Sequence, residues 1–258
     1  KNISDAVIEF CERTGASVGL IPSRRQVDFD RGYANNWKTK SFISYIRRRS
    51  GLVVIQRDHG GPNQGDDEDD GMESFFHDAL GGFDLIHIDP WKKYPSLDRA
   101  SEITANCIKF CYLVNPSCEY EIGTEEAIRK YGPEELDLFL DLVRNKINDS
   151  EWNRVRYAVI QSGTKLSSGK NTGKFDKNKL ERMIEVCSAH NLLSKEHNGD
   201  YLDQSQIRTR FEYGLDSINV APEIANIESK VLMENPRIAD MMFSECVDSG
   251  RWEKWFPK

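Results

Sequence analysis

The chain has 258 residues and a formal net charge of −7 at pH 7. This length suits one large domain or two modest ones. The acidic balance argues against nucleic acid or an anionic membrane as the main partner. No apolar run approaches the roughly 18 residues of a membrane span. We therefore expect a cytoplasmic protein with a small-molecule partner, whose six scattered cysteines are reduced and mostly buried.

Seven short apolar runs recur along the chain. Most are rich in β-branched or aromatic residues and end at Gly, Pro, Asn or Ser, which predicts strands. These predicted strands cover residues 17–22, 52–57, 84–89, 118–123, 156–161, 191–196 and 216–221. Their starts lie 25 to 38 residues apart, so a helix fits between successive strands.

The intervening segments show helical periodicity. Residues 133–147 carry an apolar stripe behind a first-turn proline, and residues 179–187 carry another behind Asp176, a predicted N-cap. Alternating strands and helices imply parallel strands with crossover helices. We predict an α/β fold, a (β/α)₈ TIM barrel, and we place its first strand before residue 1 because the chain opens in a helical pattern. The expected organisation is one barrel domain over residues 1–258, with a C-terminal helical tail at 236–258.

The carboxyl ends of the predicted strands carry many polar side chains. In a barrel this end faces the active site. Asp58 and His59 are adjacent, so they serve one site only if the strand has ended, which the following Gly60-Gly61-Pro62 supports. Polar residues at these ends include Asp58, His59, His87, Asp89, Glu121, Glu125, Gln161, Glu196, His197 and Asn219.

This set has a chemical and a structural interpretation. Two imidazoles with a carboxylate form a known zinc-ligand set with an open position for substrate, and Asp58 is well placed to carry a proton. The structural alternative is that the histidines only make hydrogen bonds, that Asp89 forms a turn, and that Glu125 complements a helix N-terminus. So many ionisable groups at one kind of position favour the chemical interpretation.

Two basic segments are candidates for holding an anion. Arg24 follows the first predicted strand and suits a phosphate or carboxylate, with a simple surface pair as the alternative. The stretch 162–174 is a basic loop that could reach a phosphate. It is not a Walker A motif, because five residues separate its glycines and Asn171 follows the lysine.

Several segments together resemble the D-tagatose-1,6-bisphosphate aldolase subunit family, a group of class II aldolase-like TIM barrels. The resemblance runs in order from about residue 17 to 228, through "GLIPSRRQVDFDRGYAN", "QRDHGGPN", "LIHIDP", "YEIGTEEA", "VIQSG" and "KEHNGDYLDQSQIRTRFEYGLDSINVAPEI". It implies a divalent metal, Zn²⁺ by preference, held by His59 and His197 with Glu125 chosen over His87 as the third ligand. Asp58 would transfer the proton. The resemblance also points to substrate-binding residues, namely Gln26, Asn63, His87, Asp89, Gln161 and Asp200. We add Arg24 and Asn219 to this set because they lie at or after predicted strand ends.

The resemblance also has departures. Ile21 stands where the family has an acidic residue, and Arg24-Arg25 replaces a Ser-Asn pair. We therefore expect a metal-dependent carbon–carbon lyase of class II aldolase type whose substrate is a phosphorylated or other anionic sugar. The alternatives are a non-catalytic accessory subunit that stabilises a partner aldolase, and a metal-dependent sugar epimerase or isomerase. The expected assembly is a homo-oligomer or a complex with a related aldolase subunit.

Overall fold

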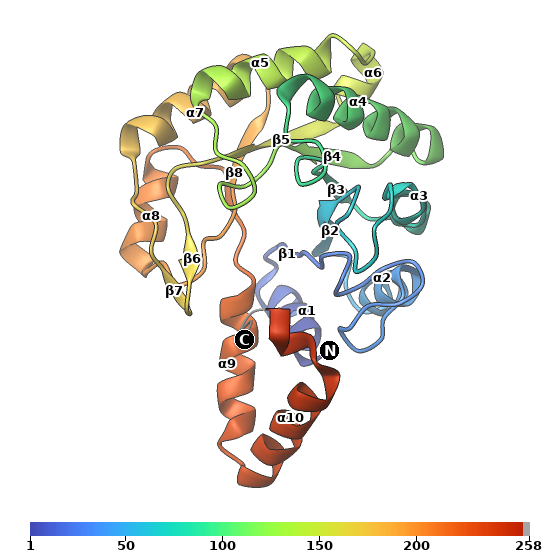
Figure 1. The fold of residues 1–258 in the computed structure, drawn as a ribbon, viewed down its shortest axis with the longest axis vertical. Coiled ribbons are helices and arrows are strands. Elements are labelled where there is room, and N and C mark those ends of the chain that lie inside the picture. Colours follow the sequence, from blue (N-terminus) through green and yellow to red (C-terminus); the bar gives the residue numbers. More distant parts are fainter. Residues whose placement is uncertain (255–258) are drawn as a thin grey trace. The chain divides into compact units, whose positions relative to one another are not determined.

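The computed structural model describes residues 1–254 (Figure 1). The chain forms two compact units, one over Lys1–Val220 and a second that begins at Ala221. The first unit holds all the described strands and every site residue predicted above. The second contains helices α9 (Pro222–Met233) and α10 (Pro236–Ser249) and the 3₁₀ helix η1 (Arg251–Lys254).

The first unit is built on one curled parallel sheet of seven strands. The strand order is β1-β2-β3-β4-β5-β8-β9, so successive long strands of the chain are neighbours in the sheet. All seven predicted strands are confirmed. Their bounds are β1 Val18–Leu20, β2 Val53–Gly60, β3 Leu85–Ile88, β4 Glu119–Ile122, β5 Val155–Ile160, β8 Leu193–Glu196 and β9 Ser217–Ile218.

The sheet is a half-barrel and not a closed eight-stranded barrel, which corrects the prediction. β1 and β9 are its two edges, because no hydrogen-bonded strand joins them within residues 1–254. The curvature and the parallel order are those of a TIM-barrel-like fold. An eighth strand ahead of residue 1 stays a prediction.

Helices lie along the outer face of the curled sheet (Figure 1). The helices predicted over 133–147 and 179–187 are confirmed, and the Asp176 side chain accepts a hydrogen bond from the backbone N–H of Lys179. The helices of this unit are α1 Asn2–Thr14, α2 Thr39–Arg47, α3 Met72–Gly81, α4 Leu97–Val114, α5 Pro133–Arg144, α6 Asp149–Trp152, α7 Lys177–Ala189 and α8 Gln204–Glu212.

The core divides according to the two-residue period of the strands. Outward side chains such as Ile55, Ile86 and Ile122 are buried within the apolar cluster that includes helix residues. Inward side chains are instead polar and buried, among them Glu121 and Lys195. The interior of the half-barrel therefore holds a polar network, which leads to the site at the carboxyl ends of the strands.

The basic segment 162–174 is more ordered than the sequence indicated. It contains an antiparallel hairpin of β6 (Leu166–Ser167) and β7 (Lys170–Asn171). All six cysteines are free thiols, and all except Cys246 are buried, as predicted. Among the residues described, no helix has both the length and the apolarity to cross a membrane.

Candidate metal centre

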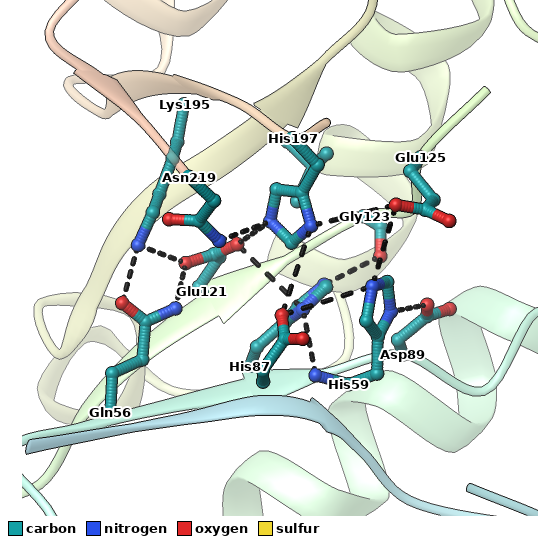
Figure 2. A network of polar contacts seen from close by, with 12 residues as sticks. Gln56, His59, His87, Asp89, Glu121, Gly123, Glu125, Lys195, His197 and Asn219 are labelled. Atoms are coloured by element: carbon teal, nitrogen blue, oxygen red, sulfur yellow. Dashed lines mark hydrogen bonds and ion pairs between the residues drawn. The ribbon is translucent and has the colours of Figure 1, made fainter. Parts of the chain in front are cut away.

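Four side chains from three strands converge at the carboxyl end of the sheet. Asp58, His59, His87 and His197 each present one ligand atom, and these atoms all lie within 4.8 Å of one another. Asp58 and His59 belong to β2, His87 belongs to β3, and His197 directly follows β8. Figure 2 shows the three imidazoles grouped together. The structure thus brings together two residues 138 positions apart in the chain, His59 and His197.

A bulge in β2 allows Asp58 and His59 to share this site. The sequence analysis required the strand to end before them, but β2 continues to Gly60. Its register with β3 shifts between Arg57 and Gly60, and His59 has a φ of 43°. This left-handed residue in a bulge turns two adjacent side chains toward one centre. A side chain at position 60 would place its Cβ 2.6 Å from the Phe75 ring, so this bulge requires glycine.

Each of the three imidazoles is held through one ring nitrogen. Nδ1 of His59 lies 2.7 Å from Oδ2 of Asp89. Nε2 of His87 lies 3.1 Å from the Gly123 carbonyl, and Nε2 of His197 lies 2.6 Å from Oε1 of Glu121. If these nitrogens donate, the opposite nitrogen of each ring offers its lone pair to the centre. This is the arrangement that orients histidine ligands in metal sites.

The His87 nitrogen at the centre, Nδ1, has only long contacts, and Oε1 of Glu121 lies 3.7 Å from it. The same nitrogen lies 3.3 Å from the backbone N–H of His59, which donates to it. Burial lowers the pKa of His87, and the nearby imidazoles of His59 and His197 lower it further against the opposing effect of Glu121. His87 is therefore neutral at pH 7, which is the form that binds a metal.

Two carboxylates flank the other two imidazoles. Oδ1 of Asp58 lies 3.8 Å from Nε2 of His59 and 3.9 Å from Nδ1 of His197. Oε2 of Glu125 lies 3.6 Å and 3.9 Å from the same two nitrogens. The Asp58 and Glu125 side chains are 18% and 16% exposed, whereas His87 and Asp89 are fully buried. Both carboxylates therefore lie where the site opens to solvent.

The charges of this group are strongly coupled. Burial disfavours the charged form of His59, but Asp58, Asp89 and Glu125 together raise its pKa well above 6.5. Burial likewise works against ionised Glu125, yet hydrogen bonding and attraction to His59 lower its pKa to about 2. Without a metal, the charged imidazole of His59 thus lies beside the ionised carboxylate of Glu125, so a positive charge at this centre is stabilised by its surroundings.

A second layer of buried groups supports the ligands, and the sequence analysis missed most of it. Glu121 accepts hydrogen bonds from Gln56 (2.8 Å) and pairs with Lys195 (2.8 Å) through Oε2, while Oε1 holds His197. Figure 2 shows this chain of contacts to the left of the imidazoles. A lysine inside an otherwise buried strand, 191–196, was the available signal, because a buried charge requires a partner.

Four residues predicted to bind substrate make hydrogen bonds within the protein, and their contact with a substrate stays a prediction. Asp89 accepts hydrogen bonds from Thr124 Oγ1 (3.1 Å) and the Trp91 N–H (3.2 Å) in addition to its contact with His59. Gln161 accepts from the Tyr131 N–H and donates to two backbone carbonyls, so its amide is saturated. Arg24 and Gln26 are likewise occupied, by Asp28 and Asp69 and by the Ser23 N–H, respectively.

The remaining predicted residues lie in the segments that follow the strands. Asn219 places its Nδ2 3.2 Å from Nε2 of His197. Asp200 is buried, and its carbonyl accepts a hydrogen bond from the Asn171 side chain in the hairpin. Asn63 has a φ of 57°, and its side-chain oxygen is buried without a hydrogen-bond partner among residues 1–254. Glu125, the predicted third ligand, is not one of the four residues of the close cluster, which includes His87.

The fold is shared with solved structures, two of which carry the name aldolase. A protein from Sinorhizobium meliloti 1021 described as a "probable tagatose 6 phosphate kinase" matches with a TM-score of 0.74 at 19% identity, over 86% of this chain and 62% of that protein. YdjI aldolase from Escherichia coli K12 matches with a TM-score of 0.66 at 14% identity, over 92% and 77%. A "putative fructose-1,6-biphosphate aldolase" from Coccidioides immitis matches with 0.66 at 18% identity, over 90% and 77%.

These likenesses establish the fold alone, because the identities are low. No protein-family model and no curated protein sequence matches the chain. The chain spans 62% of the length of the Sinorhizobium meliloti protein. It therefore has the half-barrel form of a fold that solved aldolases share.

Proposed function

We propose that the chain is a metal-dependent carbon–carbon lyase of class II aldolase type that acts on a phosphorylated or other anionic sugar. One observation carries this proposal. Three imidazoles, each held by an acceptor on one side, direct their other nitrogen to a common centre beside the partly exposed carboxylate of Asp58.

His59, His87 and His197 are the residues that would hold a divalent cation. Three imidazoles with an open fourth position are a catalytic zinc set, so Zn²⁺ is the proposed ion. When bound, such an ion supplies Lewis acidity that polarises a carbonyl oxygen. His87 replaces Glu125 as the third ligand in this proposal, because its ring nitrogen and not the Glu125 carboxylate belongs to the close cluster.

Asp58 is the proposed proton carrier. In a retro-aldol cleavage, a base removes the proton of the β-hydroxyl group as the carbon–carbon bond breaks. Asp58 is accessible, and its carboxylate lies next to two of the ligand nitrogens. Glu125 is oriented by a 2.7 Å hydrogen bond from the Asn198 amide, and it can accept a substrate hydroxyl on its side of the centre.

The comparisons support the class of substrate. Two of the three similar structures carry names that include a phosphorylated ketohexose, and two carry the name aldolase. The alternative of an accessory subunit is based on an incomplete ligand set and on the accessory members of the resembled family, and the presence of His87 in the cluster weighs against the first of these reasons. Membership of the tagatose-bisphosphate aldolase subunit family remains a hypothesis, as does assembly with itself or with a related subunit.

A second candidate is epimerisation at the carbon next to a carbonyl. The observation that favours it is the pairing of Asp58 and Glu125, whose carboxylates stand at nearly equal distances from the same two imidazole nitrogens. Two carboxylates beside one metal could remove a proton from one face of a carbon and return a proton to the other. Incorporation of solvent deuterium into an uncleaved sugar would distinguish this reaction from cleavage.

The test combines metal analysis with an activity assay. We expect about one divalent ion per purified chain, and aldehyde release from at least one member of a panel of ketose phosphates. Asp58→Asn should lower the turnover by about 10²- to 10⁴-fold, and Asp98→Asn, an exposed position in α4, should leave it unchanged. Absence of both bound metal and cleavage would overturn the proposal.

A further inference from the structure

Two cationic side chains from different loops meet at the loop that follows β2. Nζ of Lys92, in the segment after β3, donates to the Asn63 carbonyl at 2.8 Å. Nε of Arg25, in the segment after β1, donates to the Gly65 carbonyl at 3.2 Å. The two acceptors are only two residues apart. The loops that follow three adjacent parallel strands lie at the carboxyl end of the sheet, so both cations are at the same end as the histidine cluster.

These cations are poorly neutralised by the protein. Within residues 1–254, no carboxylate forms an ion pair with Lys92, and Arg25 has only Asp66, at 3.5 Å with a 69% exposed side chain. Exposed pairs of this kind contribute little. The neighbouring Arg24 differs, because Asp28 and Asp69 hold its buried guanidinium at 2.9 and 2.6 Å. The charge of Arg24 is therefore neutralised within the protein, whereas the charges of Arg25 and Lys92 remain available to a ligand.

The two cations also act on each other and on the site. Burial lowers the pKa of Lys92, the positive charge of Arg25 lowers it further, and Asp89 opposes both effects. Asp89 is the carboxylate that orients His59, so the Lys92 ammonium lies within electrostatic reach of the metal centre. Two like charges held near each other favour an anion that contacts both.

We infer that Arg25 and Lys92 form an anion subsite at the rim of the centre, which takes the phosphate monoester of the substrate. A dianionic phosphate matches two positive charges and can accept hydrogen bonds from both groups. Asp66 would leave Arg25 when the phosphate arrives, since it lies on an exposed loop and makes only a long contact. The assignment to a substrate rests on the proposed lyase, but the anion site itself can be measured without turnover.

The experiment is calorimetric titration of the purified full chain with glycerol 3-phosphate and with glycerate, two three-carbon anions. We expect glycerol 3-phosphate to bind more tightly than glycerate. Arg25→Gln and Lys92→Met should each weaken the binding of glycerol 3-phosphate about tenfold, the loss expected for one charged hydrogen bond. Lys146→Met, at an exposed lysine with no ion-pair partner among the described residues, is the matched control.

Three outcomes would overturn the subsite. The first is no binding of glycerol 3-phosphate, and the second is unchanged binding when Arg25→Gln and Lys92→Met are combined. The third is a loss of binding caused by Lys170→Met, in the basic hairpin, instead. Equal binding of glycerate would overturn the choice of phosphate. Circular dichroism of each variant checks that it is folded. Because neither probe has a bond for a lyase to cleave, an inactive protein that still binds through Arg25 and Lys92 would refute the lyase and keep the subsite.

Discussion

Two buried polar networks begin at neighbouring positions of β2 and differ in how completely their groups are paired. Arg57 faces outward and is fully buried. It donates to both carboxylate oxygens of Asp78 at 2.7 Å and to the carbonyls of Pro22 and Val27. Asp58 and His59, which follow it, belong to the inward cluster, where each imidazole keeps one nitrogen directed at an open centre.

This difference separates a structural network from a functional one. The buried Arg57–Asp78 pair, with four hydrogen bonds from the guanidinium to groups of the protein, fixes the packing of α3 on the sheet. In the cluster, each ring is oriented through one nitrogen, and the nitrogens that face the centre have only long contacts of 3.3 to 3.9 Å, so a ligand can still bind them. Burial and charge alone do not distinguish the two networks, whereas the pairing of individual atoms does.

The largest effect is expected from breaking the network of Arg57 and Asp78. Arg57→Met leaves the Asp78 carboxylate buried and uncompensated, so the free energy of unfolding should fall by about 3–5 kcal/mol. Denaturant unfolding measures this loss. Arg99→Met, in an exposed pair with Glu102, should change it by less than about 0.5 kcal/mol. Equal effects of the two substitutions would contradict the structural role given to Arg57.

Substitution within the cluster should affect metal binding more than stability. His87→Gln should weaken Zn²⁺ binding about 100-fold or more, because loss of a ligand costs at least as much as loss of an outer partner. Glu125→Gln should weaken it less than about tenfold if Glu125 is only a neighbour of the ligands. Competition with a chromophoric chelator measures both. The reverse order would restore Glu125 as the third ligand.

A smaller effect is expected where the carboxylate only orients a ligand. Asp89→Asn keeps the size of the side chain but removes the charge that holds Nδ1 of His59. Zn²⁺ affinity should fall about 10- to 100-fold. If Asp89 contacted the substrate directly, the substitution would instead change the Michaelis constant at saturating metal. Kinetics with and without excess Zn²⁺ would reveal which applies.

The smallest effect, counted per pH unit, is expected for the pH dependence of metal binding. The raised pKa of His59 means that its imidazole stays protonated above pH 6.5 in the metal-free protein. Metal must displace this proton, so affinity should rise up to about tenfold per pH unit below the raised pKa and level off above it.

The stability of the metal-free protein should change in the opposite direction. The charged form of His59 stabilises the fold fully below pH 6.5, and this contribution is lost as the pH rises through the raised pKa. Parallel titrations of affinity and thermal unfolding check the two signs, and matching signs would refute this account of His59.

The assignment of the site was most reliable where position along a strand decided it. His59, His87 and His197 all lie at carboxyl ends, so their convergence follows from parallel topology. For Gln161 and Arg24, which have suitable chemistry at suitable positions, substrate binding stays a prediction, and the structure shows partners that the sequence did not indicate. Their polar atoms are occupied by Tyr131 and by Asp69, and neither partner is near its target in the chain.

The sequence by itself determined the seven strands, the helices between them and the end of the sheet at which the polar residues gather. These features depend on hydrophobic periods of two and 3.6 residues, which any short window of the chain contains. Tertiary structure alone decided that β2 bulges at His59, that the sheet stays open between β1 and β9, and which nitrogen of each imidazole faces the centre. The reason is physical: a ring is oriented by a partner such as Asp89, Gly123 or Glu121 that lies 30 to 76 residues away in the chain, so no local pattern records the contact.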